Sequence, residues 1–263
     1  MVSLGLIHIY WYGFFIVLGI LAAIILTVKL AGYYKISKDE ILDLSFWLVI
    51  GGIIGARIFH LLIEWRYYLE NPLDIFKVWQ GGLAIHGAII AGLIIVYLYS
   101  KKKKLNAWLI VSLIVPGLAL AQAIGRWGNY FNQELFGKPT DLAWGIPISI
   151  INRPFQYIAK NYFHPTFIYE SLGSLLIFLI LLAGHIMIIK KKRQKGLNYK
   201  LLTAGYLILY SILRFLTEFI RIDQAYEFAG LRHAQITSLL IILASAGFIV
   251  WSKTAEKRKG LEK

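Results

Sequence analysis

Residues 107–137 read AWLIVSLIVPGLALAQAIGRWGNYFNQELFG, and this stretch decides the fold. Apolar residues dominate its first part, 107–124, which is close to the ~20 residues that a helix needs to cross the hydrocarbon of a bilayer. Directly afterwards, residues 125–137 place an arginine, two asparagines, a glutamine and a carboxylate among glycines and aromatics. Such groups are costly at membrane depth and are therefore candidates for function. The stretch predicts a membrane-spanning helix that leads into a functional site.

The composition extends this interpretation to the whole chain. Of 263 residues, 58% are hydrophobic and only 16% are charged, which is typical of a polytopic membrane protein and excludes an ordinary soluble globule. The chain has no cysteine, so disulfides, thiolate metal sites and a cysteine nucleophile of its own are excluded. The six histidines show no ligand spacing, and the motifs H-E-x-x-H and G-x-S-x-G do not occur, so a metal centre is not indicated.

Seven apolar runs approximate the length of a membrane span. We expect helices, because backbone that faces lipid must satisfy its hydrogen bonds internally and the alternation of a β-barrel is not found. The sequence therefore predicts an all-α integral membrane protein with about seven transmembrane helices, as a single polytopic domain over residues 1–263. The predicted spans are 10–28, 41–63, 83–100, 107–124, 166–189, 201–220 and 236–251.

The basic residues sort to alternate ends of these spans. By the positive-inside rule those ends are cytoplasmic, which puts the N-terminus outside, the C-terminus inside and the long segment 125–165 on the extracytoplasmic side. The net charge of +14 is then mostly a topology signal, and a nucleic-acid partner is not expected. The clusters are Lys29, Lys35 and Lys38; Lys101–Lys104; Lys190, Lys191, Lys192, Arg193, Lys195 and Lys200; and Lys253, Lys257, Arg258, Lys259 and Lys263.

Two groups of polar residues lie near the outer ends of the fourth and sixth spans. Arg126 and Asn129 share a helical face if the fourth helix continues, and Glu134 joins them only if that helix then breaks. Arg126 either binds phosphate or only extends its charge to the interface. On the sixth span, Arg214, Glu218 and Arg221 follow one helical stripe that also carries Tyr210, and we expect an intrahelical Arg214–Glu218 ion pair.

Further candidates lie elsewhere in the chain. His86 is flanked by glycines at the outer end of the third span, where it is either a packing residue or a general base. Arg57 follows Gly51, Gly52 and Gly55, a pattern that lets helices approach closely, and either pairs with a carboxylate or binds substrate.

Weaker candidates complete the set. Tyr12 either belongs to an interfacial aromatic belt or lines the site, and the stretch from His164 to Glu170 begins the fifth span. Because guanidinium binds phosphate in a bidentate fork, outward arginines with a histidine and carboxylates favour an enzyme that acts on a phospholipid. A non-catalytic phospholipid transporter or scramblase is the alternative.

Five ordered motifs resemble those of the prolipoprotein diacylglyceryl transferase family. They are Trp11–Tyr12–Gly13, the Gly-Gly-Leu-x-x-His-Gly stretch ending at Gly87, residues 125–137, His164–Pro165 through Tyr169–Glu170, and Arg214–Phe215 through Glu218 and Arg221. The resemblance implies a multi-pass enzyme of the bacterial cytoplasmic (inner) membrane that needs no cofactor. It also implies transfer of the diacylglyceryl group of phosphatidylglycerol to the lipobox cysteine of prolipoprotein signal peptides, with glycerol phosphate released.

This chemistry suggests roles for the candidate residues. The acceptor thiol must lose its proton to attack carbon, so His86 or Glu134 is expected to be the base. We expect Arg126 and Arg214 to hold the phosphate, and Asn129 and Glu134 to bind headgroup hydroxyls or orient Arg126. The remaining expected roles are orientation of Arg214 by Glu218, steering of anionic lipid by Arg221, and, by analogy with the family, lining of the site by Tyr12 and Tyr210.

Overall fold

The computed structural model describes residues 2–4, 7–9, 11–192 and 196–261. Seven helices in these ranges are long and apolar enough to cross a membrane, which confirms the predicted all-α multi-pass class. Tyr10, Arg193, Lys195 and Lys263, which the sequence predictions included, lie outside the described residues. The seven helices are α1 (Trp11–Tyr33), α2 (Lys38–Ile63), α4 (Ile85–Lys102), α5 (Ala107–Asn132), α6 (Thr166–Lys190), α7 (Gly196–Thr217) and α8 (His233–Leu261).

The remaining elements are short and lie between the long helices or before α1. The strands form three antiparallel pairs, β1 with β2, β3 with β4 and β5 with β6. The strands are β1 (Val2–Leu4), β2 (Ile7–Ile9), β3 (Ile146–Pro147), β4 (Tyr162–Phe163), β5 (Glu227–Phe228) and β6 (Leu231–Arg232). The short helices are α3 (Trp65–Glu70), η1 (Pro72–Phe76), η2 (Val78–Gln80), η3 (Ile150–Asn152) and η4 (Phe155–Tyr157).

Two helix ends differ from the predicted spans in a way that matters for the site. Helix α5 continues past residue 124 to Asn132, and the chain then reverses through Gln133 and Leu135, both at positive φ. Helix α7 ends at Thr217 rather than 220, so only Arg214 of its polar stripe lies within the helix. Apolar content marks the part of a helix in hydrocarbon, whereas backbone hydrogen bonding decides where the helix stops.

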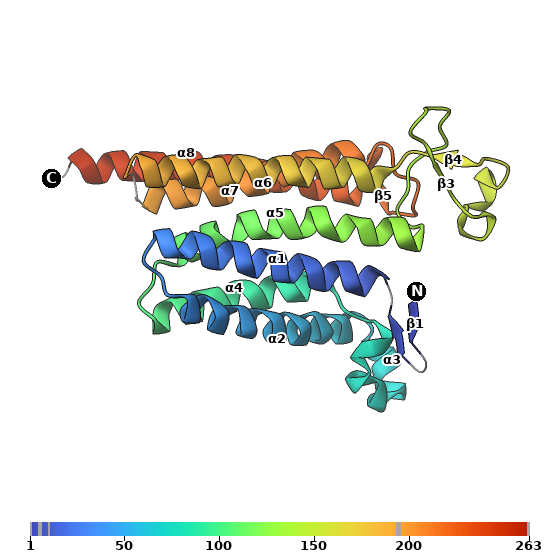
Figure 1. The fold of residues 1–263 in the computed structure, drawn as a ribbon, viewed down its shortest axis with the longest axis horizontal. Helices are drawn as coiled ribbons and strands as arrows, with labels where there is room; N and C mark the ends of the chain where they lie inside the picture. The colour runs from blue at the N-terminus through green and yellow to red at the C-terminus, as the bar shows by residue number, and fades with distance from the viewer. Residues whose placement is uncertain (1, 5–6, 10, 193–195, 262–263) are drawn as a thin grey trace. The chain divides into compact units, whose positions relative to one another are not determined.

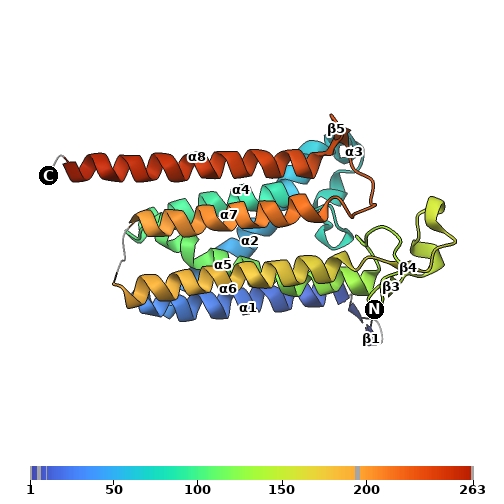
Figure 2. The ribbon, with the colours of Figure 1, turned by 90° about the horizontal axis from the view of Figure 1, so that it is seen from above.

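The contacts divide the chain into two compact units, one formed by Met1–Thr27 with Ser112–Lys263 and the other by Val28–Val111. Within the first unit, α7 packs against both α6 and α8 (Figures 1 and 2). Helices α1 and α5 approach closely at glycines, because a Cβ at Gly19 would lie 3.0 Å from the Ala121 carbonyl oxygen. A Cβ at Gly117 would lie equally close to the Ala23 carbonyl oxygen.

The second unit is built on the pair α2 and α4. A Cβ on Gly55 would lie 2.6 Å from the Gly87 carbonyl oxygen, so the glycine pattern brings the two backbones together as its spacing indicates. At one end of the pair, the Tyr99 hydroxyl donates to the Glu40 carbonyl at 2.9 Å and lies 3.0 Å from an Asp43 carboxylate oxygen. Ser37 begins α2 with a capping box.

Within each unit the basic clusters gather at one end. The Tyr99 contacts hold the end of α4, with Lys101–Lys104, beside the start of α2. In the other unit, Lys200 near the start of α7 lies 5.6 Å from the ring centroid of Trp251, close to the basic tail of α8. The basic clusters of each unit therefore lie near one another.

Candidate functional site

The end of α5 carries a connected chain of polar side chains. Arg126 Nη1 donates to Asn129 Oδ1 at 3.4 Å, and Asn129 Nδ2 donates to Glu134 Oε1 at 2.8 Å. The turn after Asn132 makes this possible, because it folds Glu134 back until its N–H bonds to the Asn129 carbonyl at 3.0 Å. The helix therefore does break, and this break brings Glu134 to the face of Arg126.

Glu170, near the start of α6, is the hub of the ion pairs. Its side chain is almost fully buried, and its Oε2 lies 2.5 Å from Arg126 Nη2 without the angles of a hydrogen bond. Its Oε1 lies 3.4 Å from Nη1 of both Arg214 and Arg221. Glu170 therefore joins the arginine of α5 to those of α7 and the loop after it. A buried carboxylate with one guanidinium on one oxygen and two on the other fixes where all three lie.

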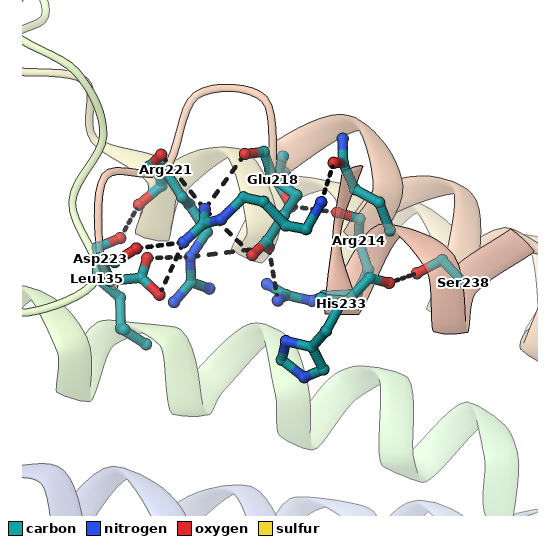
Figure 3. A network of polar contacts seen from close by, with 12 residues as sticks. Leu135, Arg214, Glu218, Arg221, Asp223, His233 and Ser238 are labelled. Carbon is teal, nitrogen blue, oxygen red and sulfur yellow. Dashed lines mark hydrogen bonds and ion pairs between the residues drawn. The ribbon is translucent and has the colours of Figure 1, made fainter. Parts of the chain in front are cut away.

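Glu218 and Asp223 complete the cluster just beyond α7. Glu218 Oε2 lies 2.8 Å from Arg214 Nη2, which confirms the predicted ion pair, and its Oε1 lies 3.1 Å from Arg232 Nη1. Asp223 Oδ1 lies 2.8 Å from Arg221 Nε, and Oδ2 lies 3.4 Å from Arg232 Nη2. Figure 3 shows Arg214, Glu218, Arg221 and Asp223 as one continuous network.

Two of the groups that lie outside the helices, Asp223 and Arg221, have pKa shifts that agree with the geometry. Burial opposes ionisation of Asp223, but its bond from Arg221 and the charges of Arg221 and Arg232 outweigh burial and lower the pKa of the carboxyl. Burial also opposes the charge of Arg221, but the Asp223 bond and the nearby carboxylates raise its pKa further above the ordinary value. Both groups are charged at neutral pH.

The four arginines differ in how open they are. Arg126 and Arg214 each leave 19% of the side chain exposed, whereas Arg221 and Arg232 leave 6% and 10%. Arg232 also donates to the carbonyl oxygens of Glu218, Arg221 and Asp223, which ties down the loop after α7. The two buried arginines hold the cluster together, and the two open ones can receive a ligand.

Aromatic side chains border the polar chain of α5. A Cβ on Gly128 would lie 2.8 Å from Tyr12 Cδ2, so this glycine seats Tyr12 of α1 against α5. The rings of Tyr130 and Phe167 lie 4.8 Å apart between centroids. On α7, Tyr210 stacks on Tyr206 with centroids 5.9 Å apart. Both predicted tyrosines thus belong to the same compact unit as the arginine cluster.

The segment after α5 folds as a head with a small core of its own, made of Phe136, Ile148 and Phe163. Gln133 Oε1 accepts from the Ser149 N–H at 2.8 Å and from Asn152 Nδ2 at 3.0 Å, which fixes the head to the end of α5. In Figure 1 the pair β3–β4 lies at the end of this unit opposite the C-terminal end of α8.

The second unit holds the other candidates. His86 is the second residue of α4, with an exposed side chain whose ring centroid lies 5.8 Å from that of Phe59. Arg57 does not pair with a carboxylate among the described residues; it donates to backbone carbonyls of the segment that follows α3. Its acceptors are Asp74, Ile75, Gly81 and Gly82. Arg57 therefore has a structural role, because its guanidinium is occupied by four carbonyls.

Comparison with known proteins gives the family. The sequence model of the prolipoprotein diacylglyceryl transferases matches residues 1–251. The chain belongs to this family. It is 42% identical over 253 residues to the phosphatidylglycerol–prolipoprotein diacylglyceryl transferase of Synechococcus elongatus, covering 95% of this chain and 86% of that protein. It is 42% identical over 238 residues to the enzyme of the same name from Finegoldia magna, covering 90% and 89%. The one from Fervidobacterium nodosum is 39% identical over 250 residues, covering 95% and 83%.

Sequence reasoning about this transferase-family chain left three members of the cluster out of the site. Glu170 was noted at the start of a span and in a family motif but was given no role, and Asp223 and Arg232 were not considered. A signal was available, since buried arginines need carboxylate partners, and acidic residues near the outer ends of the spans are few. Which carboxylate meets which arginine depends on how α5, α6 and α7 pack, and no spacing along the chain encodes that contact.

Proposed function

We propose that this protein transfers the diacylglyceryl group of phosphatidylglycerol to the cysteine thiol of a prolipoprotein signal peptide. Sulfur attacks the glycerol carbon that is bonded to the phosphate oxygen, the S–C bond forms, and the C–O bond breaks. The electron pair of that bond leaves with glycerol phosphate, and the thiol proton passes to a base on the protein. Family membership supports this reaction, and the observation that carries it is the charge of the arginine cluster.

The cluster has one positive charge more than its carboxylates neutralise. Four guanidiniums meet the carboxylates of Glu170, Glu218 and Asp223 in direct ion pairs. A phosphodiester brings one negative charge, which balances the excess in a site of low dielectric constant. The developing charge on the departing phosphate oxygen would then meet guanidiniums that stay protonated.

Arg126 and Arg214 are the groups that we assign to the phosphate. They are the more open pair, and Glu170 holds one nitrogen of each on opposite carboxylate oxygens. Glu218 would orient Arg214, and Asn129 would orient Arg126. Arg221, predicted to steer lipid, is instead suited to hold Glu170 and Asp223, since its side chain is buried in ion pairs.

Two groups remain candidates for the base. Glu134 has an exposed side chain whose Oε1 accepts from Asn129, and this suits either proton transfer or binding of headgroup hydroxyls. His86 offers an exposed imidazole at the start of α4. Rates measured across pH for Glu134→Gln and His86→Gln distinguish them, because only loss of the base removes the acid limb of the profile.

The setting of the reaction is part of the proposal. The positive-inside pattern supports an extracytoplasmic N-terminus and a head, residues 125–165, on the side where exported precursors arrive. For a bacterial protein that carries out this reaction, the membrane is the cytoplasmic one. We treat the chain as a single polytopic domain, to which α1 and α5 contribute by supplying residues to both compact units.

The decisive experiment uses the full chain in phosphatidylglycerol nanodiscs with a peptide that bears the acceptor cysteine. We expect a mass increase of the peptide by one diacylglyceryl group and release of glycerol phosphate in equal amount. An Arg126→Met variant is the matched control. Lipid movement across liposomes without adduct would favour a scramblase, and peptide binding without lipid consumption would favour a receptor; either result would overturn the transferase.

A further inference from the structure

One polar pair of this unit lies deeper in the membrane than the arginine cluster. Gln122 Nε2 on α5 donates to the Tyr206 hydroxyl on α7 at 2.9 Å. Gln122 precedes Arg126 by one helical turn, and Tyr206 precedes Arg214 by two turns, on helices that both run toward the head. The pair is therefore displaced from the phosphate site toward the hydrocarbon.

This pair keeps two hydrogen-bond donors that it does not use. With the Gln122 amide as the structure places it, the second N–H of Gln122 and the O–H of Tyr206 have no acceptor among the described residues. Gln122 Oε1 is then buried without a hydrogen-bond partner among them. If the amide is turned round, Oε1 accepts from Tyr206, and both N–H groups are left over. Neither side chain makes another hydrogen bond within the part of the chain that the structure describes.

Spare donors at this depth need acceptors, because hydrocarbon offers none. If the pair served only to connect the two helices, one hydrogen bond would be enough. Tyr206 is largely buried, whereas Gln122 is partly exposed. The four residues from Gln122 to Arg126 rise ~6 Å along the helix axis, similar to the ~5–8 Å thickness of the interfacial layer on each face of a bilayer. A lipid whose phosphate lies on Arg126 and Arg214 therefore presents its two acyl ester carbonyls at the level of this pair.

We propose that Gln122 and Tyr206 form a subsite for the ester carbonyls of the lipid donor, so that the enzyme distinguishes ester-linked from ether-linked lipid. This inference rests on the proposed function and adds to it the chemistry of the glycerol backbone. Two donors face two carbonyl acceptors, and an ether oxygen in the same place is a much weaker acceptor. Tyr210, one turn above Tyr206 and stacked on it, forms the wall between the subsite and the phosphate.

The experiment compares diester phosphatidylglycerol with its diether analogue of the same chain length, at the same mole fraction in nanodiscs. Wild-type protein should show a KM about tenfold lower for the diester, as expected for one or two neutral hydrogen bonds. Gln122→Met keeps the volume and removes the donors, and should erase that preference by raising KM for the diester alone. Tyr206→Phe should reduce the preference in part.

The controls separate recognition from a structural effect. Thr27 donates to the Ala23 carbonyl of its own helix at 2.8 Å, and its hydroxyl lies 3.5 Å from the Leu113 carbonyl of α5. Thr27→Val should change the kinetics of both lipids by the same factor. Equal use of both lipids by wild type, or equal loss on both in Gln122→Met, would overturn the subsite. The ratio of the equilibrium dissociation constants of the two lipids tests the same preference without turnover. A binding preference without thioether formation would therefore uphold the subsite and refute the reaction.

Discussion

Replacement of Glu170 by glutamine should release the arginines of the site. Glu170→Gln preserves the shape of the side chain and removes its charge, so the three ion pairs with Arg126, Arg214 and Arg221 are lost together. Because this carboxylate is only 3% exposed, loss of its charge costs about 3–5 kcal/mol of stability. Arg126 then has no carboxylate partner among the described residues, whereas Arg214 keeps Glu218 and Arg221 keeps Asp223. A displacement of about 1 Å in the phosphate-binding groups lowers kcat/KM about 100-fold.

The assay combines thermal unfolding of the purified protein, followed by tryptophan fluorescence, with thioether formation at several lipid concentrations. Asp223→Asn is the matched control, because that carboxylate is one-third exposed, so its pairs should contribute about 1 kcal/mol or less. Glu170→Asp keeps the charge but shortens the reach, and should preserve stability better than activity. A Glu170→Gln protein with wild-type kcat/KM and an unchanged unfolding midpoint would refute the assignment of Glu170 as the hub.

Four other outcomes are expected. Arg126→Lys should lower kcat/KM about 100-fold in the peptide assay, since an ammonium cannot form a bidentate contact; wild-type turnover would contradict the phosphate role. His86→Gln should flatten the dependence of rate on pH while lipid still binds, and an unchanged profile would assign the base elsewhere. Gly55→Ala should destabilise the protein by about 1–3 kcal/mol in thermal unfolding, because the new Cβ would clash with the facing helix. Gly52→Ala should be neutral, because no atom lies within 4 Å of a Cβ at that position. Because the pKa of the Asp223 carboxyl is lowered, its contribution to stability should be present above the ordinary carboxyl pKa of 3.8 and lost as the pH falls through the pKa of the folded protein. If wild type and Asp223→Asn had identical acid-unfolding curves, this prediction would be wrong.

The membrane class and the closely packed glycines followed from local rules. Each span needs a length of apolar chain that hydrocarbon thickness fixes, so composition alone located all seven helices. Close contact between two helices requires a small residue at the contact position, and the spacing of such residues is visible in the sequence, as at Gly51 and Gly55. The break after Asn132, which was the condition for Glu134 to join Arg126, also has a local origin in the backbone of Gln133 and Leu135.

The contacts within the site were harder to predict from the sequence. Arg214 and Glu218 are four residues apart, and their ion pair was predictable from that spacing. The alternatives for Arg57 were a carboxylate partner or substrate, but the structure supplies backbone carbonyls, because the segment after α3 folds over the guanidinium. Helix α7 ends before the predicted 220, so Arg221 pairs with Asp223 from a loop rather than from a helical stripe.

The sequence by itself determined that this is a membrane protein of the diacylglyceryl transferase family, with seven long apolar helices in the part of the chain that the structure describes and arginines near the ends of its spans. Only the tertiary structure decided that Glu170 joins Arg126 to Arg214, and that Gln122 meets Tyr206. The reason is physical. Hydrophobic length and helical spacing act along one segment, whereas the choice of a charge or hydrogen-bond partner depends on which helix faces pack together, and that is a property of the whole fold.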